Sequence, residues 1–497
     1  MQNSSQNLSS PPSAAATPES TDFDVPLPAK SQCCKAFIST QTTEIHCTEI
    51  ELPAAEYSRS EAYTAILSPV RRIPAELLCE IFMWTLPHTR RLRGETFEVA
   101  PWRLGHIYQR WRAITVHYAP LWTRITLCGP MSWQLDAACP PSMVETQLCR
   151  SGNALLDVYI DTSSNYEVES ESLALVINQS SRWQSLCVRA SPSGFSERIQ
   201  AARNKLPVLH TLDVLDLRSR MWSMFLTAPH LRQFLLAGDE WNPTLWTPGS
   251  RILVHLLKLP WSQITRFRGA SHPQYVGLAV LNLTPNLVEC GMAITPRWMM
   301  HLGNPHVVLP QLQRFRLSSA PPSFLQHVTA PALKELWISQ EATTSLLDFI
   351  HRSACSLTTL AIYDCSAPDL LIPILAASPN LTTFCAVFRR TTERDAQLAL
   401  LNALRPLSNG QPDACPILSR LVVGDLNACA INPLLDIAVL WHTPPITFLR
   451  AFYIGKLTSG AMDALPRVAA MKAEGFDVAI DAEFIPSVDN YIGLGRP

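Results

Sequence analysis

One phrase recurs along the chain, and its clearest copies are Leu309-Pro-Gln-Leu-Gln-Arg-Phe-Arg-Leu317 and Ala330-Pro-Ala-Leu-Lys-Glu-Leu-Trp-Ile338. Each copy has Pro-x-Leu followed by apolar residues at alternate positions, which is typical of a strand with one buried face. Two earlier strand-like runs are Leu155–Ile160 and Trp183–Val188. Further copies of the phrase begin at Leu206, Ala228, Leu259, Thr284, Cys355, Ser378 and Cys415.

From Leu206 on, successive copies begin roughly 21 to 37 residues apart, a spacing typical of leucine-rich repeats. In each copy we expect the first Leu to close a turn and the next two apolar residues to face a core. Intervening stretches such as Thr344–Ser353 and Asp395–Leu404 have helical spacing. Because no single repeat can bury its apolar face alone, the copies should stack into a solenoid. We therefore predict an α/β repeat fold over residues 146–482.

The repeats are irregular, so uneven curvature and long loops are expected. The predicted loops lie near Asp239–Ser250, Arg389–Ala414 and Gly424–Ile446. The array is predicted to end with a helix over Gly460–Glu474, Gly475 just past its C-terminus, and a strand over Phe476–Ile480. Residues 483–497 are interpreted as a C-terminal tail.

A different pattern precedes the repeats and opens with Ser68-Pro-Val-Arg-Arg-Ile-Pro-Ala-Glu-Leu-Leu-Cys-Glu-Ile-Phe82. Pro74 suits the first turn of a helix that Pro87 ends. Glu76 and Glu80 are expected on its solvent side, and a second helix is expected over Pro101–Val116. The apolar residues at helical spacing in the first helix are Leu77, Leu78, Ile81 and Phe82. Two short helices cannot hide so many large groups, so either the rest of the chain or another protein covers the surplus.

Residues 68–127 resemble an F-box of the kind found in fungal F-box-like proteins. The later pieces of the family pattern are Ala100-Pro101-Trp102, Trp111-Arg112 and Pro120-Leu121-Trp122. The chain departs from the pattern at three positions. Tyr108 stands where Cys is frequent, Ala119 where Pro is usual, and Ile73 where Leu is commoner. The matching opening residues are Ser68, Pro69, Arg71, Arg72, Pro74, Glu76, Leu77, Leu78, Glu80, Ile81 and Phe82.

The resemblance implies docking onto the Skp-family adaptor of an SCF-type ubiquitin ligase, and through that adaptor onto a cullin. For Trp102 and Trp122, packing within the chain is at least as good an interpretation as docking. The adaptor-binding residues carried over by position are Ile73, Pro74, Leu77, Leu78, Ile81, Phe82 and Trp111.

Outside these two regions, residues 1–45 are rich in Ser, Thr and Pro, which favours a disordered tail. Residues 46–67 carry an interrupted helical pattern and are interpreted as a lead-in helix, and residues 128–145 as a connector. A net charge of −1 argues against nucleic acid as the main partner. No apolar run approaches the roughly 18 residues of a membrane span, and no signal peptide opens the chain. We expect an intracellular protein, cytoplasmic or nuclear.

No catalytic motif stands out, and the 14 cysteines contain no C-x-x-C pair, so we predict a non-catalytic protein without metal or cofactor. Two hypotheses follow. The chain is the substrate-recognition subunit of an SCF-type ligase whose repeats bind an unknown target protein. Alternatively, it is an interaction scaffold whose F-box-like region is only an N-terminal cap. Candidate recognition anchors on the repeats are Arg266, Arg268, Phe315, Arg316 and Trp337, but alternation sends about half of such residues into the core.

Overall fold

The structure is a computed structural model with two compact units, Met1–Ile73 and Pro74–Pro497. Every described helix and strand belongs to the second unit. The predicted tail at 1–45, the lead-in helix at 46–67 and the tail at 483–497 lie outside the described residues. The described residues are 73–86, 101–128, 140–161, 170–189, 195–214, 220–236, 258–295, 306–365, 367, 370–389, 392, 394–405, 415–424, 428–442, 451–454, 465–475 and 477–480.

One sheet runs through the second unit, and its 14 described strands are all parallel to their neighbours and ordered as in the chain. Consecutive parallel strands need a crossover between them, so helices and loops alternate with strands. The strands are β1 (Arg124–Cys128), β2 (Leu156–Asp161), β3 (Trp183–Arg189), β4 (Thr211–Val214), β5 (Gln233–Leu236), β6 (Arg266–Pro273), β7 (Glu289–Thr295), β9 (Arg314–Ser318), β11 (Glu335–Ser339), β12 (Thr359–Cys365), β13 (Thr383–Phe388), β14 (Arg420–Gly424), β15 (Ala451–Ile454) and β16 (Asp477–Ile480). A separate parallel pair joins β8 (Val307–Val308) and β10 (Val328–Thr329).

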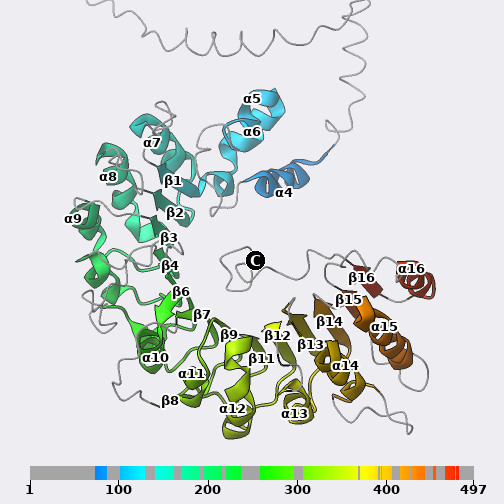
Figure 1. Ribbon diagram of the computed structural model, residues 1–497. Helices are drawn as coiled ribbons and strands as arrows, with labels where there is room; N and C mark the ends of the chain where they lie inside the picture. The colour runs from blue at the N-terminus through cyan, green and yellow to red at the C-terminus, as the bar shows by residue number, and fades with distance from the viewer. Residues whose placement is uncertain are drawn as a thin grey trace, which may run out of the picture. The chain divides into compact units, whose positions relative to one another are not determined.

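The helices between the strands cover one face of this sheet, on the outer side of its curve in Figure 1. The α-helices are α7 (Pro141–Arg150), α8 (Ser170–Asn178), α9 (Phe195–Ile199), α10 (Gln274–Leu283), α11 (Pro322–Gln326), α12 (Leu346–Ser353), α13 (Leu371–Ala376), α14 (Arg394–Ala403), α15 (Ala428–His442) and α16 (Leu465–Ala473). The 3₁₀ helices are η3 (Ser180–Arg182), η4 (Gln200–Ala202), η5 (Arg220–Thr227), η8 (Trp261–Gln263) and η9 (Gln340–Ser345).

The repeated phrase makes the same turn and strand in successive copies. Leu312, Phe315 and Leu317 are all buried in the core between sheet and helices. The backbone N–H of Lys334 donates to Gln313 O at 2.9 Å, and that of Thr358 donates to Lys334 O at 2.8 Å. The predicted parallel α/β repeat sheet is therefore confirmed, and it is consistent with a leucine-rich-repeat-like solenoid.

The helical stretches behave as expected over α12 and α14. In α12 the buried residues Leu346, Phe349 and Ile350 repeat at helical spacing and join the same core. The helix ends at Ala354, whose positive φ of 47° is the left-handed conformation common at helix C-termini. Near the end of the array, α16 and β16 match the predicted helix and strand, with Gly475 between them at φ 94°.

Two of the predicted loops contain helices. Within Arg389–Ala414 the chain forms α14. Within Gly424–Ile446 the chain forms α15, a helix of 15 residues. Its buried residues Ile431, Leu434 and Leu435 recur at helical spacing, and their burial against the sheet compensates for the loss of backbone hydrogen bonding at Pro433 inside the helix. The predicted loop at Asp239–Ser250 lies outside the described residues.

The N-terminal part of the second unit is helical, with α4 (Ala75–Thr85), α5 (Leu104–Ile107), α6 (Gln109–His117) and η2 (Ala119–Trp122). The predicted first helix is confirmed. The second is wrong as a single helix, because Tyr108 is extended, with φ −152° and ψ 146°. At this break Arg112 Nε donates to Gly105 O at 2.6 Å, which satisfies a carbonyl at the end of α5. The sheet also starts earlier than residue 146, since β1 overlaps the end of the 68–127 segment.

None of the helices in the described part of the chain has the length and apolar character that a membrane crossing requires. Four of the cysteines described there are buried, as expected for small apolar side chains: Cys290, Cys365, Cys385 and Cys415. Burial raises the pKa of Cys385 and that of Cys415 to about 12 each, which keeps these thiols protonated near neutral pH.

Candidate functional site

Helix α4 carries two apolar stripes that face different surroundings. Leu78 and Phe82 are each 1% exposed and pack into the unit. Leu77, Ile81 and Trp84 are 55%, 46% and 83% exposed. These three lie four and three residues apart, so they share one side of the helix.

The buried stripe rests on the neighbouring helices. The rings of Phe82 and Trp111 meet edge to face with centroids 5.0 Å apart, so α4 is held against α6. If Leu78 and Phe82 contacted an adaptor directly, they would be partly exposed in the isolated chain, but both are buried. Their side chains occupy the space between α4 and its neighbours, and they support the helix from behind.

The exposed stripe is continuous with the start of the helix, where Pro74 is also exposed. We call Pro74, Leu77, Ile81 and Trp84 the docking stripe. Ile73, immediately before it, is half-buried. Trp84 is not among the docking residues predicted from the sequence, although it follows Ile81 by three residues, a spacing that places both on one side of a helix. Large apolar side chains at adjacent positions on one helix face are costly to leave in water, which favours an interaction role.

Trp102 and Trp122 are engaged within the chain. Their rings meet edge to face at 4.8 Å, and the guanidinium of Arg150 on α7 lies 4.4 Å from the Trp122 ring centroid. Trp122 Nε1 donates to the buried carbonyl of Thr115 at 2.6 Å. These contacts join α6 and η2 to α7, so the packing interpretation of Trp122 is confirmed.

The face of the sheet opposite the helices, here called the inner face, is defined by strand register. Arg268 on β6 pairs with Gly291 on β7, and Gly291 pairs with Arg316 on β9. Arg316 in turn pairs with Trp337 on β11. Side chains at one register level of a parallel sheet share a face, so these positions form a row across it.

This register shows which of the candidate recognition anchors lie on the inner face and which are buried in the core. Phe315 is fully buried in the helix-covered core, so it is not available to a partner. Arg268, Arg316 and Trp337 are on the inner face, as is Arg266 two positions before Arg268. Alternation along β9 separates Phe315 from Arg316, and the side covered by helices decides which of the two is buried.

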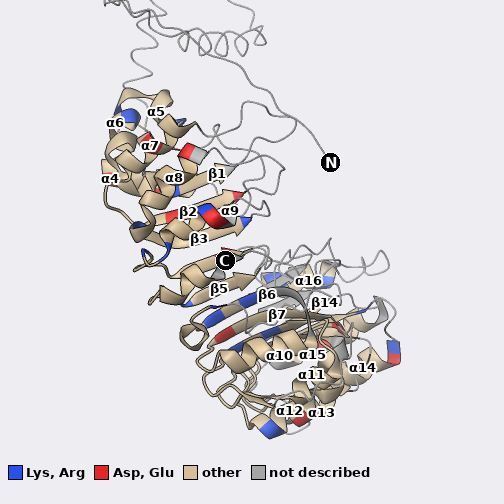
Figure 2. Cartoon of the chain, turned by 90° about the vertical axis from the view of Figure 1, so that its left-hand side faces the viewer, with Lys and Arg blue, Asp and Glu red and all other residues tan. Residues whose placement is uncertain are grey.

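Four arginines gather on β6 and β9 around one buried glutamate. Glu289, with its side chain 6% exposed, lies 3.0 Å from Arg268, 3.4 Å from Arg314 and 3.8 Å from Arg266. In Figure 2 basic residues, coloured blue, lie on β6 and on strands beside it. We call Arg266, Arg268, Arg314 and Arg316 the arginine patch.

The electrostatics of the patch are dominated by its positive charges. Burial raises the pKa of Glu289, but the hydrogen bond from Arg268 and the charges of Arg268, Arg316 and Arg314 lower it overall. Arg316 is steadied by the ring of Trp337, whose centroid lies 4.5 Å from its guanidinium carbon. The carboxylate is therefore ionised, and it orients the arginines without neutralising all of them.

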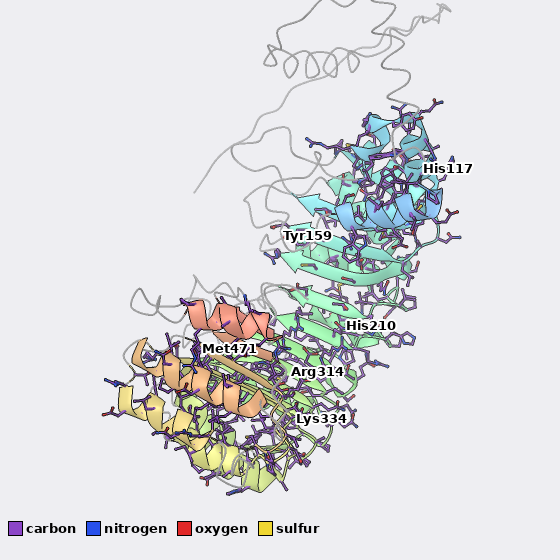
Figure 3. All side chains as sticks on the ribbon, turned by 90° about the vertical axis from the view of Figure 1, so that its right-hand side faces the viewer. His117, Tyr159, His210, Arg314, Lys334 and Met471 are labelled. Carbon is purple, nitrogen blue, oxygen red and sulfur yellow. The ribbon has the colours of Figure 1, made fainter. Side chains whose placement is uncertain are left out.

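Basic side chains also lie along the edge where the strands begin, although His210 among them is uncharged near neutral pH. Figure 3 shows His210, Arg314 and Lys334 along that edge, each at or just before the start of a strand. Burial and then the charges of Arg232, Arg266 and His230 lower the pKa of His210. On the other side of Trp337 the inner face becomes apolar, with a buried cluster of Ala361, Tyr363, Cys385, Val387 and Val422.

The molecule is thus an α/β protein with an all-parallel sheet of sequential strands, preceded by packed N-terminal helices that present an apolar stripe. A scan against models of known protein families and a search of curated proteins find no match for the chain. Among the residues that the structure describes, no three His, Cys, Asp or Glu side chains gather as metal ligands would.

Proposed function

We propose that the chain is a substrate-recruiting subunit of an SCF-type ubiquitin ligase. The docking stripe of α4 binds a Skp-family adaptor, which links the chain to a cullin. The inner face of the sheet holds the target protein. The chain performs no covalent chemistry; it holds the target so that the lysines of that protein lie near the charged ubiquitin carrier.

The observation that carries this proposal is the two-sided apolar character of α4. A helix that only capped the sheet would need one apolar stripe, and Leu78 with Phe82 supplies it. The second stripe, at Leu77, Ile81 and Trp84, keeps 55%, 46% and 83% of its surface exposed, so much of its apolar surface is not used in that packing. The F-box resemblance of residues 68–127 supplies the identity of the partner.

In this proposal the predicted adaptor-binding residues divide into two roles. Pro74, Leu77 and Ile81 contact the adaptor directly, together with Trp84. Leu78, Phe82 and Trp111 hold α4 in place from behind, and Ile73 extends the apolar surface before the helix. Burying a fully exposed Leu or Ile contributes about 1.5–3 kcal/mol, so a few such contacts are enough for stable association.

The test is co-purification of the full chain with a Skp-family adaptor. Leu77→Asp with Ile81→Asp should weaken binding at least about a hundredfold, because two apolar contacts are lost and two charges must be desolvated. The matched control is Leu226→Asp with Val308→Asp, since these side chains are 47% and 56% exposed on the repeats. Both double variants should unfold at nearly the wild-type temperature.

The rival hypothesis is an interaction scaffold whose N-terminal helices serve only as a cap. It is favoured by the burial of Leu78, Phe82 and Trp122 and by the contacts that join α6 and η2 to α7. Under that hypothesis the wild-type chain captures no adaptor, and Leu77→Asp with Ile81→Asp changes nothing but local stability. Such a result contradicts the ligase proposal.

A further inference from the structure

The inner face has a surplus of positive charge where β6, β7, β9 and β11 lie side by side. These four strands carry the four arginines of the arginine patch and two glutamates, Glu289 and Glu335, which leaves an excess of two positive charges. Glu289 contacts three of the arginines through its two carboxylate oxygens. One carboxylate therefore organises several cations without cancelling them.

The spacing of these cations suits an extended ligand that crosses the strands. Arg268 and Arg316 stand two strands apart, about 9.6 Å at the usual separation of strands. Gly291, between them in the row, contributes no side chain. A peptide in the extended polyproline II conformation advances about 3.1 Å per residue and returns to the same side every third residue, so carboxylates three residues apart would reach both guanidinium groups.

The arginine heads are also prearranged. Arg268 is held by Glu289 at 3.0 Å, and Arg316 is held over Trp337 at 4.5 Å. Side chains that are already ordered lose less entropy on binding, and guanidinium groups pair with carboxylates in two parallel hydrogen bonds. Arg266 and Arg314 remain 51% and 42% exposed, so a ligand can reach them.

We propose that the arginine patch binds an acidic, extended peptide segment of a partner protein. The segment crosses β6, β7 and β9 with its carboxylates on Arg268 and Arg316, and it reaches Trp337 at its end. This assignment depends on the proposed function only for its role in target recruitment. An excess of only two positive charges disfavours a nucleic-acid backbone, whose binding depends on neutralising many phosphates.

The test uses a fluorescein-labelled peptide with Glu at every third position and Ser between, about ten residues long, with purified full-length chain and no adaptor. Its anisotropy should rise on titration, and the affinity should fall as ionic strength increases. Arg268→Gln with Arg316→Gln should weaken binding at least about tenfold, the effect of losing one charge-assisted hydrogen bond or more. Replacing every Glu in the peptide by Gln should abolish binding to the wild-type chain.

The control variant is Arg203→Gln with Arg394→Gln, which removes the same charge from exposed positions outside the patch. It should bind the peptide as the wild type does. The proposal is overturned if the control variant loses as much affinity as the patch variant, or if the patch variant binds the peptide as tightly as the wild type. It is also overturned if the wild-type chain binds the Gln peptide as tightly as the Glu peptide. So does an oligodeoxynucleotide of the same charge that binds more tightly than the peptide. Because no adaptor is present, a failure here is distinct from a failure of adaptor docking.

Discussion

Replacing Glu289 by Gln should move stability and ligand binding in opposite directions. The side chain is 6% exposed and lies within 4 Å of three arginines. Removing one partner of a fully buried ion pair costs about 3–5 kcal/mol. Here the arginine side chains keep 27–51% of their surface in water, so we expect a smaller loss of unfolding free energy, about 1–3 kcal/mol.

The same substitution should strengthen binding of the acidic peptide. A negative charge about 7 Å from a ligand carboxylate opposes binding by about 0.6 kcal/mol in water and more at lower dielectric, so its removal should improve affinity about threefold or more. Denaturant titration measures the first effect and peptide anisotropy the second. Weaker binding by Glu289→Gln would show that the orientation of the arginines matters more than their net charge, which refutes the charge argument.

The contribution of Glu289 to the free energy of unfolding should depend on pH in a definite direction. Because the pKa of Glu289 is lowered in the folded chain, its stabilising contribution is present above the ordinary pKa of about 4.3 and is lost as the pH falls through the folded value. The stability difference between wild type and Glu289→Gln should therefore shrink below about pH 4. A difference that stays constant through that range contradicts an ionic origin.

Two further substitutions test the packing. Trp122→Phe removes the donor to Thr115 O, and it should cost about 1–3 kcal/mol and speed hydrogen exchange in η2 and β1; unchanged exchange would mean that this bond does not hold the helices to the sheet. Gly277→Ala would place a methyl group 2.7 Å from Ile294 Cδ1 and 3.2 Å from the Phe324 ring, so overpacking of about 1–3 kcal/mol should outweigh the roughly 1 kcal/mol gain in helix propensity. A higher melting temperature for Gly277→Ala would show that the neighbours yield.

Local pattern was sufficient for the repeat architecture. Pro-x-Leu followed by alternating apolar residues specifies a turn and a half-buried strand within about nine residues, and recurrence of the phrase at leucine-rich-repeat intervals implies that neighbouring copies stack. The first helix of the N-terminal module was also readable from Pro74 and the spacing of Leu77 to Phe82. Two predictions failed because local pattern does not report distant contacts. Helix α15 tolerates Pro433 because its apolar face is buried, and the helix predicted over Pro101–Val116 is divided at Tyr108 into α5 and α6.

Local sequence pattern specifies the order of the helices and strands and the set of residues that alternate between two faces. It does not determine which face is covered. Leu77 and Leu78 are identical side chains at adjacent positions, and only the location of α6 and η2 decides that Leu78 is buried and Leu77 is exposed. In the same way, Arg268, Glu289 and Arg314 are separated along the chain by more than 20 residues at each step, and parallel register brings them together. Burial and charge pairing depend on neighbours that are distant in sequence, whereas strand and helix periodicity depend on residues nearby.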